Sequence, residues 1–461
     1  MFDKKIYQER RSSLKKKLKS GLVVFPGNND IPFNSTGNTY PFRQDSSFLY
    51  FCGLDFPGLW LFLDIDENAE FITGKTKTLE DIIWSGGCNS LQETANLSGI
   101  NRIIPPNKMH EIISSAVKNG REVHFLPQYR DDVRIQLSGM LDIPERKLDT
   151  RVSIDLIRAV SNLRSIKNRE EILEIESAID ISREMYLEAM RLSVAGVSES
   201  DISGRISGIA YAKGRGLAFQ MTCSIRGEIL HNCRYRNTLK KGDLLLIDSG
   251  VESSLHYASD ITRTLPVGGN FSLRQREIYS IVLSALNRVV EMLKPGEKYI
   301  SCHLEAAKII ANGLKNLEIM RGNMDEAVAA GAHALFFPHG IGHLIGLDVH
   351  DMESLGEEHT GYNSRIKRSD QFGLSSLRFA KELKKNYTLT VEPGIYFIPE
   401  LIRKWKAEKH LSEFINYNNA MEYIKFGGIR IEDDVLITDT GCRVLSRDIP
   451  KSIADLESQA G

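Results

Sequence analysis

The stretch FFPHGIGHLIGLDVHD, residues 336–351, places three histidines and two aspartates among glycines and large apolar residues. Titratable side chains are rarely left in so apolar a setting unless they are paired or bound to something. A lone buried histidine is usually a hydrogen-bonded core residue, but three within twelve residues weaken that interpretation. His339 and His343 are four residues apart and would share a face on one helical turn, with His350 seven residues further on.

The same run contains Gly340, Gly342 and Gly346 in a loose GxGxxxG pattern. A dinucleotide site needs a strand that leads directly into a helix N-terminus, with an acidic residue about 20 positions later. Pro338 and the flanking histidines fit that arrangement poorly, so a dinucleotide site is disfavoured.

Two aspartates lie in strand-like sequence, in DLLLIDSGVESSLHYASDITRT. Asp248 ends the first predicted strand, and Asp260 lies twelve residues later within the second. A hairpin that turns at Ser254 would place the two carboxylates opposite each other, with Cβ atoms about 4.5–5.5 Å apart. Carboxylates that close repel, so one must be protonated or both must share a cation. Taken alone, two unrelated aspartates at strand ends are the simpler interpretation.

Two further apolar strands each carry a carboxylate. In LTVEPGIYF, Glu392 precedes Pro-Gly and lies where a strand ends. In GGIRIEDDVLIT, isoleucines alternate with Arg430 and Glu432, so the isoleucines would face the core and the two charged residues would lie side by side on the opposite face. A guanidinium there can orient a carboxylate that is itself bound to something else. Alone, either segment is equally well a paired surface acid.

Considered together, four carboxylates and one imidazole suit a pair of hard divalent cations. Ligation by carboxylates without thiolates favours manganese over a structural zinc, although cobalt, iron or zinc can substitute. Two metals about 3.5–4 Å apart would share a bridging hydroxide, which is a nucleophile at neutral pH. One histidine would then bind metal, and its neighbours would contact the substrate.

Length and composition limit the class of protein. At 461 residues the chain exceeds the roughly 250–300 residues at which single cores stop growing, so two domains are expected. Lys plus Arg (59) nearly cancels Asp plus Glu (60), so there is no overall field to attract nucleic acid or an anionic membrane. No run approaches the roughly 20 apolar residues of a membrane span.

The cysteines are scattered and contain no CxxC pair: Cys52, Cys88, Cys223, Cys233, Cys302 and Cys442. This usage is typical of a reduced compartment, and the charged N-terminus is unlike a secretory signal, so we expect a cytoplasmic protein. The N-terminal segment carries eight basic residues. Tyr7, Leu14 and Leu18 fall at helical spacing before Gly21, which favours a short amphipathic helix with a solvated basic face, ending at Gly21, over a nucleic-acid-binding tail.

Patterning divides the chain near residues 150–165. Short strands and helices of a mixed α/β domain occupy residues 1–160, and residues 161–461 form a second domain. Asn168, with Glu171 three residues later, predicts a helix start, and long helices are expected over residues 273–293 and 300–317. Two charged stretches, 352–388 and 399–426, are interpreted as surface excursions, the second partly helical.

Five ordered segments closely resemble the aminopeptidase P and prolidase group of the metal-dependent pita-bread peptidases: LLLIDSG, YASDITRTLPV, HGIGHLIGLDVHD, TVEPGIYF and GIRIEDD. GEILHN, with His231, also matches, and YPFRQDSSFLYFCGL resembles the N-terminal domain of aminopeptidase P. The resemblance spans nearly the whole chain. It implies an α+β fold, in which a curved, mainly antiparallel sheet backed by helices follows a smaller α/β domain.

The resemblance also implies residue roles. The ligands of a dinuclear, usually manganese, site would be Asp248, Asp260, His343, Glu392 and Glu432. Asp260 and Glu432 would bridge both metals. His231, His339 and His350 would contact substrate and stabilise the tetrahedral intermediate, with Arg430 supporting the ligands and Glu392 also carrying the proton. Relatives of this kind assemble as dimers or tetramers, so a homo-oligomer is expected.

The expected reaction is hydrolysis of the bond between an N-terminal residue and a following proline. That bond lacks an N–H and leads into a rigid ring, so ordinary aminopeptidases handle it badly. Compared with the family pattern, the separation of the two aspartates is one residue longer, and the stretches after His350 and between Glu392 and Glu432 are extended. The alternatives are an Xaa-Pro dipeptidase (prolidase), a metal-free creatine amidinohydrolase, a non-enzymatic peptide-binding module of the same fold and a two-metal phosphatase.

Overall fold

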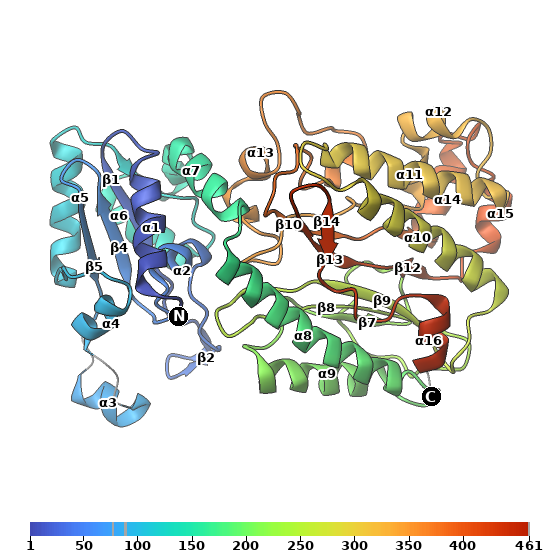
Figure 1. The fold of residues 1–461 in the computed structure, drawn as a ribbon, viewed down its shortest axis with the longest axis horizontal. Helices are drawn as coiled ribbons and strands as arrows, with labels where there is room; N and C mark the ends of the chain where they lie inside the picture. The colour runs from blue at the N-terminus through green and yellow to red at the C-terminus, as the bar shows by residue number, and fades with distance from the viewer. Residues whose placement is uncertain (76–77, 87–89, 460–461) are drawn as a thin grey trace. The chain divides into compact units, whose positions relative to one another are not determined.

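The computed structural model describes residues 1–75, 78–86 and 90–459. The chain forms two compact units, residues 1–164 with 354–360 and residues 165–353 with 361–461. Both units combine helices with sheets (Figure 1). Among the described helices, none has both the length and the apolar character needed to cross a bilayer.

The first unit is built around a sheet in the order β5-β4-β1-β6, with β1 pairing antiparallel with β4 and parallel with β6. The strands are β1 (Leu22–Pro26), β4 (Trp60–Asp64), β5 (Ala69–Thr73) and β6 (Val123–His124). Successive side chains of a strand point to opposite faces. Val24 therefore packs with residues of α5 (Met109–Lys118) and α6 (Asp131–Leu141), while Phe25 stacks on Phe51 of α2 (Ser46–Cys52). Helices thus cover both faces of this sheet.

Helix α1 (Lys4–Lys15) buries Tyr7 and Leu14, as their spacing predicts. The predicted solvated basic face is only partly present, because Arg11 is fully buried and donates to backbone carbonyls within the unit. The helix also ends before Gly21, which adopts a φ of +102° in the following turn. The other elements of residues 1–165 are β2 (Pro32–Ser35), β3 (Asn38–Thr39), α3 (Leu79–Ser85), α4 (Leu91–Leu97) and α7 (Ile154–Ser165), and α13 (Glu357–Thr360) also belongs to this unit.

Small antiparallel sheets form the centre of the second unit. The strands are β7 (Thr222–Ser224), β8 (Leu244–Ser249) and β9 (Ile261–Pro266) in one sheet, β10 (Thr388–Val391), β13 (Asp433–Ile437) and β14 (Cys442–Val444) in another, and β11 (Gly394–Tyr396) paired with β12 (Gly428–Arg430). A backbone bridge between Thr262 and Glu432 ties β9 to the two-residue link between β12 and β13. A second bridge, between Leu344 and Leu389, ties the histidine-rich segment to β10. These bridges bring the carboxylate-bearing strand ends together.

Two pairs of helices support these sheets (Figure 1). Helices α8 (Arg169–Leu192) and α9 (Glu199–Lys213) pack beside β7–β9, and α10 (Leu273–Met292) and α11 (Tyr299–Asn316) lie toward the other strands. Asn168 and Glu171 form the predicted reciprocal cap at the start of α8. The predicted helices over 273–293 and 300–317 match α10 and α11 to within a residue at each end. The remaining helices are α12 (Met324–Ala329), α14 (Pro399–Glu408), α15 (Tyr417–Glu422) and α16 (Ile453–Gln459).

The register of the β8–β9 hairpin differs from the prediction. Asp248 lies opposite Thr262, not opposite Asp260. The turn is centred on residue 255 instead of 254, because the Ser253 N–H closes it on the Tyr257 carbonyl at 2.8 Å. The offset is two residues along the partner strand, so Asp260 keeps the face of Asp248 and becomes its diagonal neighbour.

The histidine-rich segment is not helical, which corrects the idea of a shared helical face for His339 and His343. Residues 338–350 run irregularly except at the Leu344 bridge. Gly342 has a φ of +154°, which is not helical, and a Cβ there would lie 2.2 Å from the Thr390 carbonyl oxygen. The segment thus packs directly against β10, and its histidines reach the same cavity along an extended path.

Candidate metal centre

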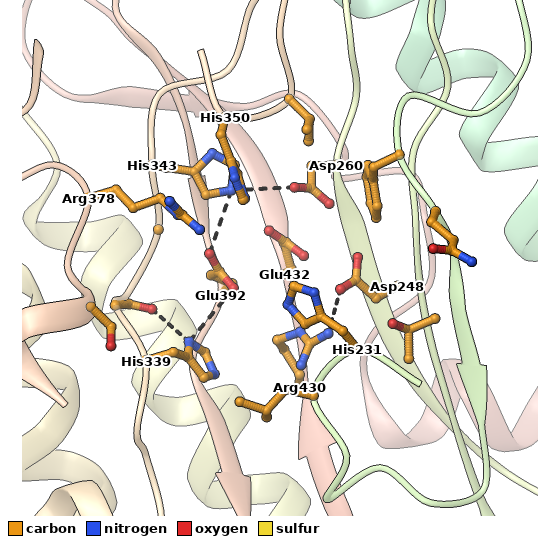
Figure 2. A pocket seen from close by; sticks show the side chains of 18 of the residues that line it. His231, Asp248, Asp260, His339, His343, His350, Arg378, Glu392, Arg430 and Glu432 are labelled. Atoms are coloured by element: carbon orange, nitrogen blue, oxygen red, sulfur yellow. Dashed lines mark hydrogen bonds and ion pairs between the residues drawn. The ribbon is translucent and has the colours of Figure 1, made fainter. Parts of the chain in front are cut away.

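A cavity of about 480 Å³ opens where the strand ends of the second unit converge. Its wall includes all the candidate residues proposed from the sequence: His231, Asp248, Asp260, His339, His343, His350, Glu392, Arg430 and Glu432. Figure 2 shows these side chains gathered around one centre. The positions follow from the strands, because Asp248 lies near the end of β8, Asp260 directly before β9 and Glu392 directly after β10.

Carboxylate oxygens surround one imidazole nitrogen in this cavity. The Nε2 atom of His343 lies 3.4 Å from Oδ2 of Asp260 and 3.7 Å from Oε1 of Glu392 (Figure 2). Ligand atoms of Asp260, His343 and Glu432 all lie within 4.8 Å of one another, a spacing that can hold one metal ion. The Nδ1 atom of His343 is 3.0 Å from the Leu344 carbonyl oxygen and must donate to it. That hydrogen bond leaves Nε2 unprotonated and turned toward the carboxylates, as a metal ligand requires.

Arg430 organises the other side of the cluster. Its guanidinium donates to Oδ2 of Asp248 at 2.5 Å and to the Tyr396 hydroxyl at 2.8 Å. Its Nε donates to the Thr262 hydroxyl at 3.1 Å, and that hydroxyl donates to Oε2 of Glu432 at 2.7 Å. Arg430 therefore fixes one oxygen of Asp248 directly and one oxygen of Glu432 through Thr262.

Burial and mutual repulsion act against ionisation of the carboxylates. Burial, and then the charges of Glu432 and Asp248, raise the pKa of Asp260 well above its usual value. Burial, and then Glu392 and Asp248, raise the pKa of Glu432 in the same way. Burial also raises the pKa of Glu392 to about 8, against the opposing effect of the Arg430 charge. Without bound cations, the folded site holds protons that free carboxyl groups would release at neutral pH.

The unpartnered atoms of the cluster test whether divalent cations fit. Oδ1 of Asp248, Oδ1 of Asp260 and Oε1 of Glu432 are buried and accept no hydrogen bond. A buried carboxylate oxygen without a donor is costly unless a cation binds it. The other oxygen accepts from Arg430 in Asp248 and from Thr262 in Glu432, while Oδ2 of Asp260 lies 3.4 Å from the unprotonated Nε2 of His343, as two ligands of one cation would. The free oxygens and the His343 nitrogen form a hard, oxygen-rich donor set, which suits divalent ions.

The other two histidines of the 336–351 segment are held differently from His343. Nδ1 of His339 donates to the Gly340 carbonyl, and Nε2 accepts from the Tyr396 hydroxyl, both at 2.8 Å. His350 packs edge-on against His343, with ring centroids 4.3 Å apart, and its Nδ1 lies 2.8 Å from Oε2 of Glu353. Both nitrogens of His339 are therefore engaged, whereas His350 keeps Nε2 for a ligand.

The structure corrects the interpretation of residues 352–388 as a surface excursion. Ser376 and Arg378 line the cavity, and Leu377 and Phe379 beside them are fully buried. Arg378 forms an ion pair with Glu353, the same carboxylate that holds His350. The stretch therefore returns to the site and contributes a guanidinium to its wall.

Sequence reasoning missed Tyr396, Thr262 and Arg378 as site residues. Tyr396 lies four residues after Glu392 within the TVEPGIYF motif, and Thr262 alternates with Asp260, so both had a positional signal. Arg378 lies in an irregular charged stretch, where no periodicity marked it. His231, on the loop between β7 and β8, reaches the same cavity as predicted.

Comparison with known proteins identifies the family of this chain. Residues 174–439 match the model of metallopeptidase family M24, and residues 7–124 match the N-terminal domain of aminopeptidase P. The chain therefore belongs to metallopeptidase family M24 and is a metalloaminopeptidase. It is similar to the Xaa-Pro aminopeptidase of Haemophilus influenzae, with 30% identity over 472 residues that cover 99% of this chain and 97% of the relative.

Solved structures show the same fold. An Escherichia coli aminopeptidase P variant in complex with substrate superposes with a TM-score of 0.82 at 27% identity, covering 100% of this chain and 98% of the other. A zinc-substituted E. coli aminopeptidase P in complex with product gives a TM-score of 0.81 at 28% identity, with the same coverage. The predicted α+β fold, a pita-bread catalytic domain after a smaller α/β domain, is confirmed, and divalent metals are the cofactor class of this family.

Metal removal should make the stability of the protein depend on pH in a defined direction. The pKa of Glu392 is raised to about 8 in the folded chain by burial, against about 4.5 for the free group. Its contribution to stability is therefore complete below about pH 4.5 and is lost as the pH rises through about 8. We expect chelated protein to melt at a lower temperature at pH 8.5 than at pH 6, and manganese to restore more stability at pH 8.5. Thermal unfolding with and without chelator checks this, and an unchanged pH dependence in Glu392→Gln would contradict the assignment.

Proposed function

We propose that the protein is an Xaa-Pro aminopeptidase that holds two divalent ions, with manganese as the preferred metal. The observation that carries the proposal is the convergence of Asp248, Asp260, His343, Glu392 and Glu432 in one cavity, with buried oxygens that lack donors. Names of relatives across the full length support the proline specificity. The match of residues 7–124 to an aminopeptidase P domain favours aminopeptidase over dipeptidase activity.

Bound divalent ions would supply a hydroxide nucleophile at neutral pH and polarise the scissile carbonyl. Asp260 and Glu432 would hold both ions, because each has a buried oxygen without a donor, and the second oxygen faces His343 in Asp260 and is oriented by Thr262 in Glu432. Glu392 would carry the proton from the nucleophile to the proline nitrogen, since it lies beside both His343 and His339. Arg430 would keep Asp248 oriented while the substrate binds.

The histidines would divide their roles according to their hydrogen bonds. His350 would donate to the developing oxyanion from Nε2 as a doubly protonated ring, because its Nδ1–H is already donated to the Glu353 carboxylate. His339 positions the Tyr396 hydroxyl, since both of its own nitrogens are engaged. From the sequence, His339 is expected to contact the substrate and stabilise the tetrahedral intermediate. Its hydrogen bonds support the positioning of Tyr396 instead. His231 would contact the substrate from the side of the cavity that holds Asp248 and Arg430 (Figure 2).

A matched peptide panel tests the substrate class. Xaa-Pro-Xaa should be cleaved with manganese, while Xaa-Ala-Xaa and the Xaa-Pro dipeptide should be cleaved at least about 100-fold more slowly, and chelation should abolish turnover. Release of the N-terminal residue, measured by chromatography, gives the rates. A preference for the dipeptide would identify an Xaa-Pro dipeptidase. Metal bound without cleavage of any peptide would contradict the peptidase proposal.

Two substitutions separate metal binding from turnover. His343→Ala should lose both bound metal and activity, because it removes the imidazole nitrogen that faces the carboxylates. His350→Ala should retain the metal and lose roughly 100–1000-fold in kcat, the cost of one oxyanion donor. Metal content by mass spectrometry and kcat on the same samples provide the comparison. Wild-type kcat in His350→Ala would exclude the oxyanion role.

We propose a homo-oligomer in which α3 takes part. Its side chains Leu79, Ile83 and Trp84 are 74%, 71% and 82% exposed, an apolar surface that a second copy of the chain would cover.

We also propose a cytoplasmic location, in keeping with the free thiols of the described cysteines, while Cys88 lies outside the described residues. Cell fractionation tests the location.

Light scattering during gel filtration tests the assembly. The wild-type protein should elute as a dimer or tetramer, and Trp84→Asp should reduce the assembly size, because a charge would be buried at the contact. Ile135→Asp is the matched control, since Ile135 is 61% exposed on α6 of the same unit. Equal masses for all three proteins would contradict the assignment of α3.

A further inference from the structure

The loop that carries His231 has little regular structure of its own. Residues 225–237, called here the His231 loop, follow β7. The structure describes every one of them, and none lies in a helix or strand. His231 and Cys233 of this loop line the catalytic cavity. Gly227 rests against the backbone of Gly428 at the start of β12, where a Cβ on Gly227 would lie 2.6 Å from the Gly428 oxygen. Contacts outside the loop must therefore set the position of His231.

Glu199, on the first turn of α9, holds both ends of this loop. Its Oε1 accepts the Ile225 N–H at 2.8 Å, and its Oε2 accepts the Asn237 N–H at 3.0 Å. The Asn237 side-chain amide also donates to both oxygens, at 2.9 and 3.0 Å. The first and last residues of the loop thus meet on one carboxylate.

Glu199 is buried, so its carboxylate oxygens depend on the donors around them. The residue is 0% exposed, and the hydrogen bonds that its carboxylate accepts come from amide groups. A buried ionised carboxylate is tolerated only when donors satisfy its oxygens. Hydrogen bonds to a charged group contribute about twice as much as neutral ones. A neutral side chain of the same shape cannot replace it, because the amide of glutamine presents N–H groups where the loop also presents donors.

We propose that Glu199 is a positioning residue that closes the His231 loop and so sets the placement of His231 in the catalytic cavity. The inference rests on the proposed function, in which His231 contacts the substrate. Glu199 itself touches neither the substrate nor the candidate metal ligands, and it acts through the backbone at residues 225 and 237. Release of one end would let His231 shift, and a displacement of about 1 Å at a catalytic group can reduce the rate about 100-fold.

The decisive experiment is a double-mutant cycle on manganese-loaded protein, with Glu199→Gln, His231→Ala and the double variant. Glu199→Gln should lower kcat by about 10–100-fold while metal content stays at the wild-type level. In the double variant kcat should equal that of His231→Ala. Once the His231 imidazole is removed, Glu199 has no side chain left to position, so its own substitution should cost nothing more. Glu171→Gln is the matched control: Glu171 is also buried, but it caps α8 and receives the Tyr257 hydroxyl, so kcat should stay near wild type.

Hydrogen exchange gives a readout that does not depend on activity. In Glu199→Gln, the amides of Ile225 and Asn237 should exchange faster, while those of β8 and β9 keep their protection. Should Glu199→Gln fail to fold, Asn237→Ala removes the side-chain donor from the loop end and should show the same pattern more weakly. Losses that multiply in the double variant, or unchanged exchange in the loop, would overturn the inference. Wild-type kcat in His231→Ala would instead refute the role of His231 within the proposed function.

Discussion

The main constraint on the second unit is the repulsion between carboxylates that are buried side by side in its cavity. Asp260 and Glu432 are at least 95% buried, and their unpartnered oxygens face one cavity with Asp248 and Glu392. Such a cluster is stable only if protons or cations neutralise it. The surrounding hydrogen bonds are arranged to fix one oxygen of a carboxylate and leave the other free. Binding of divalent metals would therefore remove the free-energy cost of burying these repelling carboxylates.

Two buried arginines, Arg430 and Arg263, hold the carboxylates and the backbone around them in place. Arg430 holds Asp248 and, through Thr262, Glu432, while Arg263 is fully buried and donates to the Glu432 carbonyl and the Asp433 carboxylate. These contacts join β9 to the chain around β12 and β13. A guanidinium suits this work because its donors form a rigid planar fork. The geometry of the candidate metal centre and the stability of the sheet junction thus depend on the same hydrogen bonds.

Three histidines of the site are held in place although they lie on irregular backbone. His231, His339 and His350 lie outside helices and strands. Each is held by named partners: Glu199 joins the two ends of the His231 loop, Tyr396 and the adjacent Gly340 carbonyl hold His339, and Glu353, three residues away, holds His350. Loops that carry functional residues are commonly fixed by a rigid scaffold in this way.

The sequence by itself determined most of the elements that carry the candidate ligands and marked the candidate ligands themselves. Alternation placed Arg430 and Glu432 together, strand ends marked Asp248 and Glu392, and the cap at Asn168 located α8, because these signals are local. Only the tertiary structure decided the β8–β9 register, the extended path of residues 338–350 and the return of Arg378 to the cavity. Those features depend on a turn closed by Ser253, on the close approach of Gly342 to β10 and on contacts between segments far apart in the chain. Sequence periodicity reports which face a residue occupies, whereas register and long-range contact are set by packing.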